Sequence, residues 1–155
     1  MKILLVCLGN ICRSPMAEGI LRHKIREAGL AVTTDSAGTS SHHRGESPDA
    51  RAVRCLREKG IDISHLRARP FVREDYHRFD RIYAMDTTNL SDILNLAPDE
   101  DIARRAELFL HISHPGSHRS VPDPWYGDMR DFEAVYHMLD KACDVLMEDI
   151  RMAIK

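Results

Sequence analysis

A thiol and a guanidinium lie six residues apart, at Cys7 and Arg13, directly after an apolar run. The residues between them include a glycine and an asparagine, which tolerate tight or left-handed backbone; they are Leu8, Gly9, Asn10, Ile11 and Cys12. Ser14 and Pro15 follow, and both suit the start of a helix. A loop between a strand and a helix N-terminus points its N–H groups inward and can bind a tetrahedral oxyanion. We therefore expect the segment from Leu8 to Ser14 to bind an anion.

The chemistry that this pair could perform is nucleophilic attack on a bound phosphate. Arg13 could hold two phosphate oxygens with its planar fork, and the positive field around it favours the thiolate form of Cys7. A thiolate beneath a phosphate is a nucleophile aimed at phosphorus, and Ser14 could donate a hydrogen bond to the sulfur. The alternative is a turn with a buried cysteine and an arginine that pairs elsewhere. The place of the pair between a strand and a helix favours the catalytic interpretation.

The hydrophobic pattern predicts the elements that would position this loop. Short apolar runs predict buried strands at residues 2–6, 32–37, 81–85 and 107–112. Helical spacing predicts helices from Ser14-Pro15 to residue 28, from Ser47-Pro48 to a stop at Gly60, over residues 89–96, and over a closing segment that contains residues 132–153. Ser14 is expected to cap the first helix, and Thr87 or Thr88 the third. Segment 114–127 is rich in Pro, Gly and Ser, which predicts a loop.

The alternation of strands with helices predicts the fold class. It implies right-handed βαβ units and a parallel sheet covered by helices on both faces, an α/β fold. In such folds ligands bind beyond the carboxyl ends of the strands. The segment from Cys7 to Arg13 follows the first predicted strand, and the loop 114–127 comes after the fourth. Both should therefore lie at the same edge of the sheet.

The predicted loop carries a candidate acid, Asp123, between Pro122 and Pro124. The prolines restrict its backbone, and a carboxylic acid near the site could protonate a phenolate leaving group. A Pro-Asp-Pro turn with its carboxylate in solvent explains the same residues equally well. Trp125 and Tyr126 follow, and at least one of them is expected to form a wall against a phenyl ring. Alternatively, one of these aromatic residues anchors the loop to the core.

Length and composition limit the class of protein. A chain of 155 residues suggests one domain over residues 1–155, and 43% hydrophobic with 30% charged residues is typical of a globular protein. The net charge of −2 gives no bulk field that favours nucleic acid or an anionic membrane. No stretch approaches the roughly 20 apolar residues of a membrane helix, and no signal peptide is visible. We therefore expect a cytoplasmic protein with free thiols at Cys7, Cys12, Cys55 and Cys143, the last two in the core.

The segment VCLGNICRSPMAE resembles the phosphate-binding signature of the low-molecular-weight protein tyrosine phosphatases. Further segments are similar to blocks of that family, in the family's order: DSAGT at residues 35–39, GESPDARA at 45–52, LRAR at 66–69, DRIYAMD at 80–86 and VPDPWYG at 121–127. The resemblance implies a four-stranded parallel sheet with flanking helices, the Rossmann-like three-layer fold of phosphotyrosine phosphatase I. It also implies that phosphotyrosine-containing proteins are the partners, and that no metal or cofactor is used. We expect a monomer.

The resemblance further implies a role for each site residue. Cys7 would attack the phosphorus of phosphotyrosine and become a cysteinyl-phosphate, while Arg13 and the loop amides hold the other oxygens. Asp123 would protonate the leaving tyrosine oxygen and then activate the water that releases phosphate. Cys12 would form a reversible disulfide with Cys7 that protects the nucleophile from over-oxidation. Otherwise, Cys12 is a small buried hydrophobic residue.

Three alternative functions are possible. Thioredoxin-coupled arsenate reductases use a similar loop on this fold, but they need two further cysteines close together, and Cys55 and Cys143 are far apart in the sequence. Protein arginine phosphatases share the fold and typically have Thr where this chain has Ile11. A non-catalytic phosphate-binding module would need neither Cys7 nor Asp123.

Histidines occur at two places where a functional role could be considered. Where the family often has an aromatic residue at the mouth of the site, this chain has His42, His43 and Arg44, which leaves the substrate preference open. A second group lies around a Pro-Gly pair that prevents a helix from aligning it, namely His111, His114 and His118. We expect solvated loop histidines rather than metal ligands.

Overall fold

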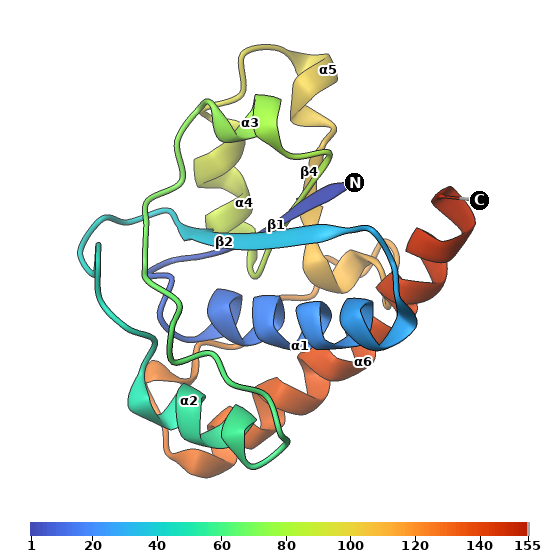
Figure 1. The fold of residues 1–155 in the computed structure, drawn as a ribbon. Coiled ribbons are helices and arrows are strands. Elements are labelled where there is room, and N and C mark those ends of the chain that lie inside the picture. Colours follow the sequence, from blue (N-terminus) through green and yellow to red (C-terminus); the bar gives the residue numbers. More distant parts are fainter. Residues whose placement is uncertain (155) are drawn as a thin grey trace.

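The computed structural model describes residues 1–154, and within that range four strands form one parallel sheet. The strands are β1 (Lys2–Cys7), β2 (Thr33–Gly38), β3 (Arg81–Ala84) and β4 (Ala106–Leu108). Their spatial order is β2-β1-β3-β4, so β1 lies inside the sheet between β2 and β3 (Figure 1). Every neighbouring pair is parallel. The predicted α/β fold is confirmed.

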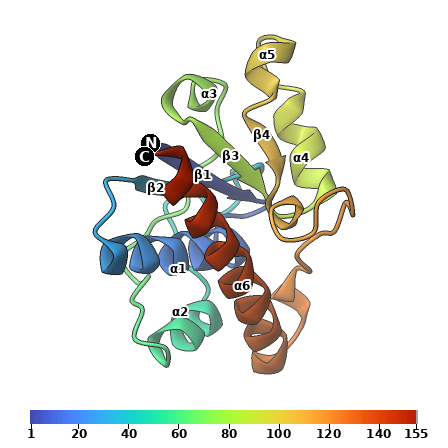
Figure 2. The same cartoon turned by 90° about the vertical axis from the view of Figure 1, so that its right-hand side faces the viewer.

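Helices cover both faces of the sheet (Figures 1 and 2). One face carries α1 (Arg13–Ala28), α2 (Ala50–Arg57) and α6 (Met129–Ala153), and the other carries α3 (Asp75–Arg78), α4 (Thr87–Leu94) and α5 (Glu100–Ala103). Side chains of β1 alternate between these faces. Ile3 and Leu5 pack toward α1 and α6, whereas Leu4 and Val6 pack toward α4. Because both faces are covered, the strand is apolar throughout.

Two predicted helix starts are wrong by a few residues. Helix α2 begins after Asp49, not at Ser47-Pro48, because the Asp49 side chain accepts a hydrogen bond from a free amide of the first turn. Helix α4 is capped by Asp86 rather than by Thr87 or Thr88. Asp86 has the extended backbone that an N-cap residue needs, whereas both threonines already lie within the helix.

The fourth strand is shorter than predicted. β4 ends at Leu108, and the residues expected to continue it form the 3-10 turn η1 (Phe109–His111). Phe109 and Leu110 are both buried, and a short buried apolar run looks the same in a strand and in a turn. Helices α3 and α5 lie in segments without a prediction, because one helical turn is too short to show a 3.6-residue period.

The closing helix α6 packs against α1 and α2. Asp128 and Asp131 form a capping box at its start. Its buried face includes Cys143, and α2 buries Cys55, so both cysteines lie in the core as predicted. In residues 1–154, no helix combines the length and the apolar character needed to cross a bilayer.

Candidate active site

The phosphate loop, residues 8–14, follows the end of β1 and turns directly into α1. Asn10 adopts a left-handed conformation with a φ of 58°, which asparagine tolerates. The sulfur of Cys7 accepts a hydrogen bond from the Asn10 amide at 3.3 Å and lies 3.0 Å from Ser14 Oγ. Cys7 is buried, so its sulfur lies at the floor of the loop.

Side-chain hydrogen bonds hold the loop in this shape. Asn10 Nδ2 donates to Ser14 Oγ at 2.8 Å and to Ser36 Oγ at 2.9 Å, and Asn10 Oδ1 accepts from the Arg69 amide at 3.0 Å. Ser14 therefore does not cap α1 as predicted: the N-cap is Cys12, which makes no side-chain capping bond. The first amides of α1 are thus left available to an anion rather than to a side chain.

A buried carboxylate supports the loop from behind. Glu18 of α1 is 1% exposed, accepts a hydrogen bond from Ser36 Oγ at 2.6 Å, and pairs with Arg22. Burial raises the pKa of Glu18, and the hydrogen bonds from Ser36 and Arg22 offset only part of that shift. A continuous chain of hydrogen bonds thus connects Glu18 through Ser36 to Asn10, which lies in the phosphate loop.

The guanidinium of Arg13 is 3% exposed and meets groups from two other segments. Its Nη1 donates to Asp86 Oδ2 at 2.7 Å and to the Val121 carbonyl at 3.0 Å, and its Nη2 lies 3.6 Å from Asp123 Oδ2. Asp86 was not predicted as a site residue. A carboxylate that directly follows a buried strand, at the edge where ligands bind, is the sequence signal that could have identified it.

Asp123 precedes the 3-10 turn η2 (Pro124–Tyr126), and its Oδ1 accepts a hydrogen bond from the Trp125 amide at 3.1 Å. The start of this loop is tied to the sheet edge, because the Val121 amide donates to the Met85 carbonyl at 2.8 Å. The side chain of Asp123 is 37% exposed. Its carboxylate is therefore positioned by the local turn and is still open to the cavity at this edge.

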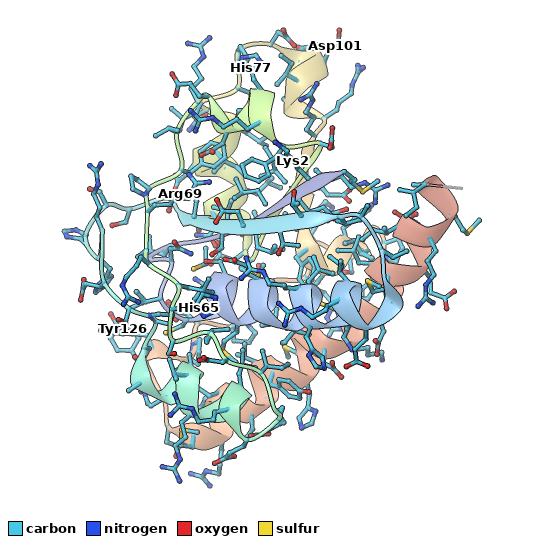
Figure 3. The ribbon with its side chains drawn as sticks, in the orientation of Figure 1. Lys2, His65, Arg69, His77, Asp101 and Tyr126 are labelled. Carbon is cyan, nitrogen blue, oxygen red and sulfur yellow. The ribbon has the colours of Figure 1, made fainter. Side chains whose placement is uncertain are left out.

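One cavity of about 530 Å³ is lined by most of the predicted site residues, but not by Asn10 and Ser14, whose side chains bond to each other. Three loops line it, with Cys7, Leu8, Gly9, Ile11, Cys12, Arg13, Ser40, His42, His43, Asp123, Trp125 and Tyr126. The rings of Trp125 and His43 lie 5.6 Å apart, while Tyr126 is 94% exposed and projects from the rim (Figure 3). His42 and His43 thus line the cavity, at the mouth of the site where the sequence analysis placed them.

Cys12 lines the same cavity and is almost completely buried. Burial, together with the negative charge of Asp49 nearby, raises the pKa of the Cys12 thiol. All four cysteines are free thiols in this structure, so the reversible disulfide between Cys7 and Cys12 stays a prediction. Within residues 1–154, no three His, Cys, Asp or Glu side chains are grouped so that they could hold a metal ion.

A second cavity, of about 650 Å³, lies between α1 and α6. Acidic and basic side chains line it and pair with one another, as Lys24 does with Asp140 at 2.8 Å and with Asp144 at 2.7 Å. Within this cavity Lys24 is thus held by two carboxylates of α6.

Known proteins resemble the chain over nearly its whole length. The profile of the family described as low molecular weight phosphotyrosine protein phosphatase matches residues 2–155. The low molecular weight phosphotyrosine protein phosphatase of Sus scrofa is 41% identical over 153 residues, which are 97% of this chain and 96% of that protein.

Solved structures agree with this assignment. The crystal structure of a protein tyrosine phosphatase from Entamoeba histolytica matches with a TM-score of 0.92 and 34% identity, over 100% of this chain and 99% of that one. The YwlE arginine phosphatase, in a structure with a phosphorylated active-site serine, matches with a TM-score of 0.88 and 27% identity, over 97% of this chain and 96% of that one. The motifs, the fold and these likenesses together show that the chain belongs to the low molecular weight phosphotyrosine protein phosphatase family.

Proposed function

We propose that the chain hydrolyses phosphotyrosine in proteins, with Cys7 as the nucleophile and Asp123 as the general acid and base. Arg13 and the amides from Leu8 to Ser14 bind the phosphate. The observation that carries this proposal is the convergence of a thiol, a guanidinium and a carboxylic acid on one cavity, from segments far apart in the chain. These are the groups that phosphate transfer through sulfur requires.

In the first step, the thiolate of Cys7 attacks phosphorus from the floor of the loop. An S–P bond forms as the bond between phosphorus and the tyrosine oxygen breaks. Asp123 donates its proton to that oxygen, so that tyrosine leaves as a neutral phenol. Arg13 and the loop amides hold the remaining oxygens and stabilise the charge that spreads over them.

In the second step, water attacks the phosphorus of the cysteinyl-phosphate. Asp123, now ionised, accepts a proton from the water, and the S–P bond breaks to release inorganic phosphate and the thiolate. Ser14 Oγ, 3.0 Å from the sulfur, can donate a hydrogen bond to the thiolate as it leaves. The acid and the thiol are then back in their starting states.

The cavity wall supports an aromatic substrate. Trp125 and Tyr126 follow the acid by two and three residues and line the cavity with it, so a phenyl ring that carries the phosphate would lie against at least one of them. Tyr126 is almost fully exposed, which leaves it free to contact the protein that carries the phosphotyrosine.

Phosphoarginine is the second candidate substrate, because the chain also resembles an arginine phosphatase in structure. Ile11, which lines the cavity, is the residue that bears on this choice. Arginine phosphatases typically have a threonine there, whose hydroxyl could bond to a guanidinium, whereas the side chain of Ile11 is purely apolar. Ile11 therefore favours tyrosine as the leaving group.

A turnover screen over phosphotyrosine, phosphoserine and phosphoarginine peptides tests the proposal, with Cys7→Ser as the blank. We expect phosphate release from phosphotyrosine and none above the blank from phosphoserine. Preferential release from phosphoarginine would replace tyrosine phosphatase with arginine phosphatase. Binding without release from any peptide would indicate a phosphate-binding module, and arsenate-dependent oxidation of thioredoxin would indicate a reductase.

A further inference from the structure

The segment GESPDARA, at residues 45–52, contains an arginine that reaches the loop carrying the acid. We propose that Arg51 is a positioning residue for Asp123. Arg51 holds the acid loop, residues 121–127, so that the carboxylate of Asp123 meets the leaving oxygen. The inference rests on the proposed function, because it concerns the acid of that reaction.

The guanidinium of Arg51 holds the far end of the acid loop. Its Nη1 donates to the Gly127 carbonyl at 2.8 Å, and its Nη2 donates to the Trp125 carbonyl at 3.1 Å. The same group lies over the ring of the buried Phe132 in α6, 4.6 Å from the ring centroid. A planar fork with fixed donors sets the positions of two carbonyls at once, so these contacts fix the course of the loop.

Asp49 locks Arg51 in place and connects it to the phosphate loop. Asp49 Oδ1 accepts from Arg51 Nε at 3.0 Å, and Asp49 Oδ2 accepts from Nη2 at 2.9 Å. Burial opposes the ionisation of Asp49, but the hydrogen bonds from Arg51 outweigh it and lower the pKa of Asp49. The Asp49 amide donates to the Ile11 carbonyl at 2.8 Å. The start of α2 therefore ties both halves of the site together.

Two residues of the acid loop are buried, Val121 and Pro124. Val121 donates through its amide to the Met85 carbonyl after β3, and its carbonyl accepts from the Arg13 side chain of α1. Beyond it, Trp125 is 40% exposed and Tyr126 is 94% exposed. Asp123 lies between the anchor at Val121 and the anchor that Arg51 provides. Without Arg51 the part of the loop after Pro124 would lose its anchor, and the carboxylate could move away from the leaving oxygen.

The test compares two leaving groups in the intact chain. Arg51→Met removes the fork while keeping an unbranched side chain, and kcat/KM is measured on a phosphotyrosine peptide and on 2,4-dinitrophenyl phosphate. Tyrosine needs a proton to leave, whereas dinitrophenolate does not. We expect kcat/KM to fall roughly 10- to 100-fold on the peptide and less than about 3-fold on dinitrophenyl phosphate. A purely structural role would lower both alike.

Two further variants test whether the fork of Arg51 matters rather than its charge, and whether loss of any arginine from α2 has the same effect. Arg54→Met changes an arginine of the same helix that is 71% exposed and lies 3.5 Å from Glu58, so both substrates should react at the parent rate. Arg51→Lys keeps the charge, but one ammonium cannot hold both carbonyls and Asp49. It should show the same selective loss as Arg51→Met, and it carries the test if the methionine variant does not fold. Full recovery with lysine would overturn the inference.

A double-mutant cycle tests the link to the acid itself. In an Asp123→Asn background there is no proton donor to position, so Arg51→Met should lower kcat/KM on the peptide by less than about 3-fold further. A full second loss would overturn the inference. Equal losses on both leaving groups, with an active parent, would overturn it while leaving the proposed function intact. A parent without phosphotyrosine turnover would overturn the proposed function first, and the positioning role with it.

Discussion

Asp86 serves two neighbours with one carboxylate. Its Oδ2 accepts from Arg13 at 2.7 Å, and its Oδ1 accepts from the Asn89 amide at 2.7 Å at the start of α4. Arg13 is almost completely buried, so Asp86 provides much of the counter-charge that this guanidinium has in place of water. At the scale of single residues, one carboxylate therefore both caps α4 and balances the charge of Arg13.

Asp86→Asn should destabilise the protein more in the absence of phosphate than in its presence. The amide can still cap α4, but it leaves the buried guanidinium with the Val121 carbonyl and the more distant Asp123. We expect a loss of about 2 kcal/mol, below the roughly 3–5 kcal/mol of a fully buried broken pair. A bound phosphate would supply the missing counter-charge and so restore part of the lost stability. Thermal unfolding with and without phosphate measures this, and an equal loss in both conditions would contradict it.

Asp123→Ala should separate substrates by their need for a proton. We expect kcat/KM on phosphotyrosine to fall by about 10² to 10⁴, the usual contribution of a general acid, and to fall far less on aryl phosphates with acidic phenols. The measurement is a plot of log kcat/KM against leaving-group pKa, which should become steeper in the variant. Parallel lines for parent and variant would remove Asp123 from the acid role.

The sequence allowed Cys7, Arg13 and Asp123 to be proposed, because each lies in a short segment whose residue types already suggest its chemistry. Arg51 could not be identified in this way, and the only local signal for Asp86 is its place directly after a buried strand. Asp86 meets Arg13 across 73 residues, and Arg51 meets the acid loop across 74 and 76 residues, so their roles depend on tertiary contacts. Neither residue type is unusual in its own segment.

At the scale of elements, the end of β2 supports the phosphate loop by close backbone contact. A Cβ added at Gly38 would lie 2.7 Å from the Leu8 carbonyl oxygen and 3.1 Å from the Asn10 amide nitrogen. Because the neighbours are backbone atoms of the loop, the loop itself would have to move. Gly38→Ala should therefore cost about 1–3 kcal/mol of stability and lower kcat/KM roughly 10-fold on every aryl phosphate alike.

Gly19→Ala is the matched control for this prediction. A Cβ there would lie 2.4 Å from Cγ2 of Ile63 and 3.3 Å from Cγ2 of Ile61, which are core side chains rather than loop backbone. We expect a similar loss of stability, measured by urea unfolding, with kcat/KM within about 2-fold of the parent. If both variants lost activity equally, the contact of Gly38 with the loop would not explain the effect.

The hydrophobic pattern of the sequence predicted the order and type of the main strands and helices. It did not predict the start of α2 or the end of β4. The run that forms β1 is apolar on both faces and bounded by a turn, so it reads clearly as a buried strand. The segment after β4 is equally apolar, yet it turns at Phe109 to bring the chain back over the sheet. Hydrophobicity reports burial, and it cannot tell a buried turn from a buried strand.

For the whole molecule, strand order explains why the site lies where it does. From β1 the chain enters α1 on one face of the sheet, and from β3 it enters α4 on the other (Figures 1 and 2). β1 and β3 are neighbours, so the chain diverges between their carboxyl ends, which is where α/β folds bind ligands. Cys7 ends β1, and Asp86 follows β3 at the same edge. The sheet topology thus brings Cys7 close to Asp86, the carboxylate that holds the guanidinium of Arg13.

The stability of the whole molecule also depends on pH through Glu18, whose ionisation opposes folding, unlike that of most carboxyl groups. Burial raises the pKa of Glu18 above its ordinary value of 4.5. Above pH 4.5, up to that raised pKa, the folded state therefore binds more protons than the unfolded state, and the free energy of unfolding decreases as pH rises. Glu133 behaves oppositely, because a hydrogen bond from Lys59 lowers its pKa. Its contribution is present above pH 4.5 and is lost as pH falls.

Glu18→Gln and Glu133→Gln should therefore respond to pH in opposite directions. Glutamine resembles the protonated carboxyl, so Glu18→Gln should gain stability relative to the parent as pH rises from about 4 to about 8, because the parent must ionise a buried group. Glu133→Gln should lose stability relative to the parent over the same range, because it lacks the pair with Lys59. Urea unfolding of the three proteins at each pH measures both differences. If the two differences changed in the same direction, burial of Glu18 would not control its ionisation.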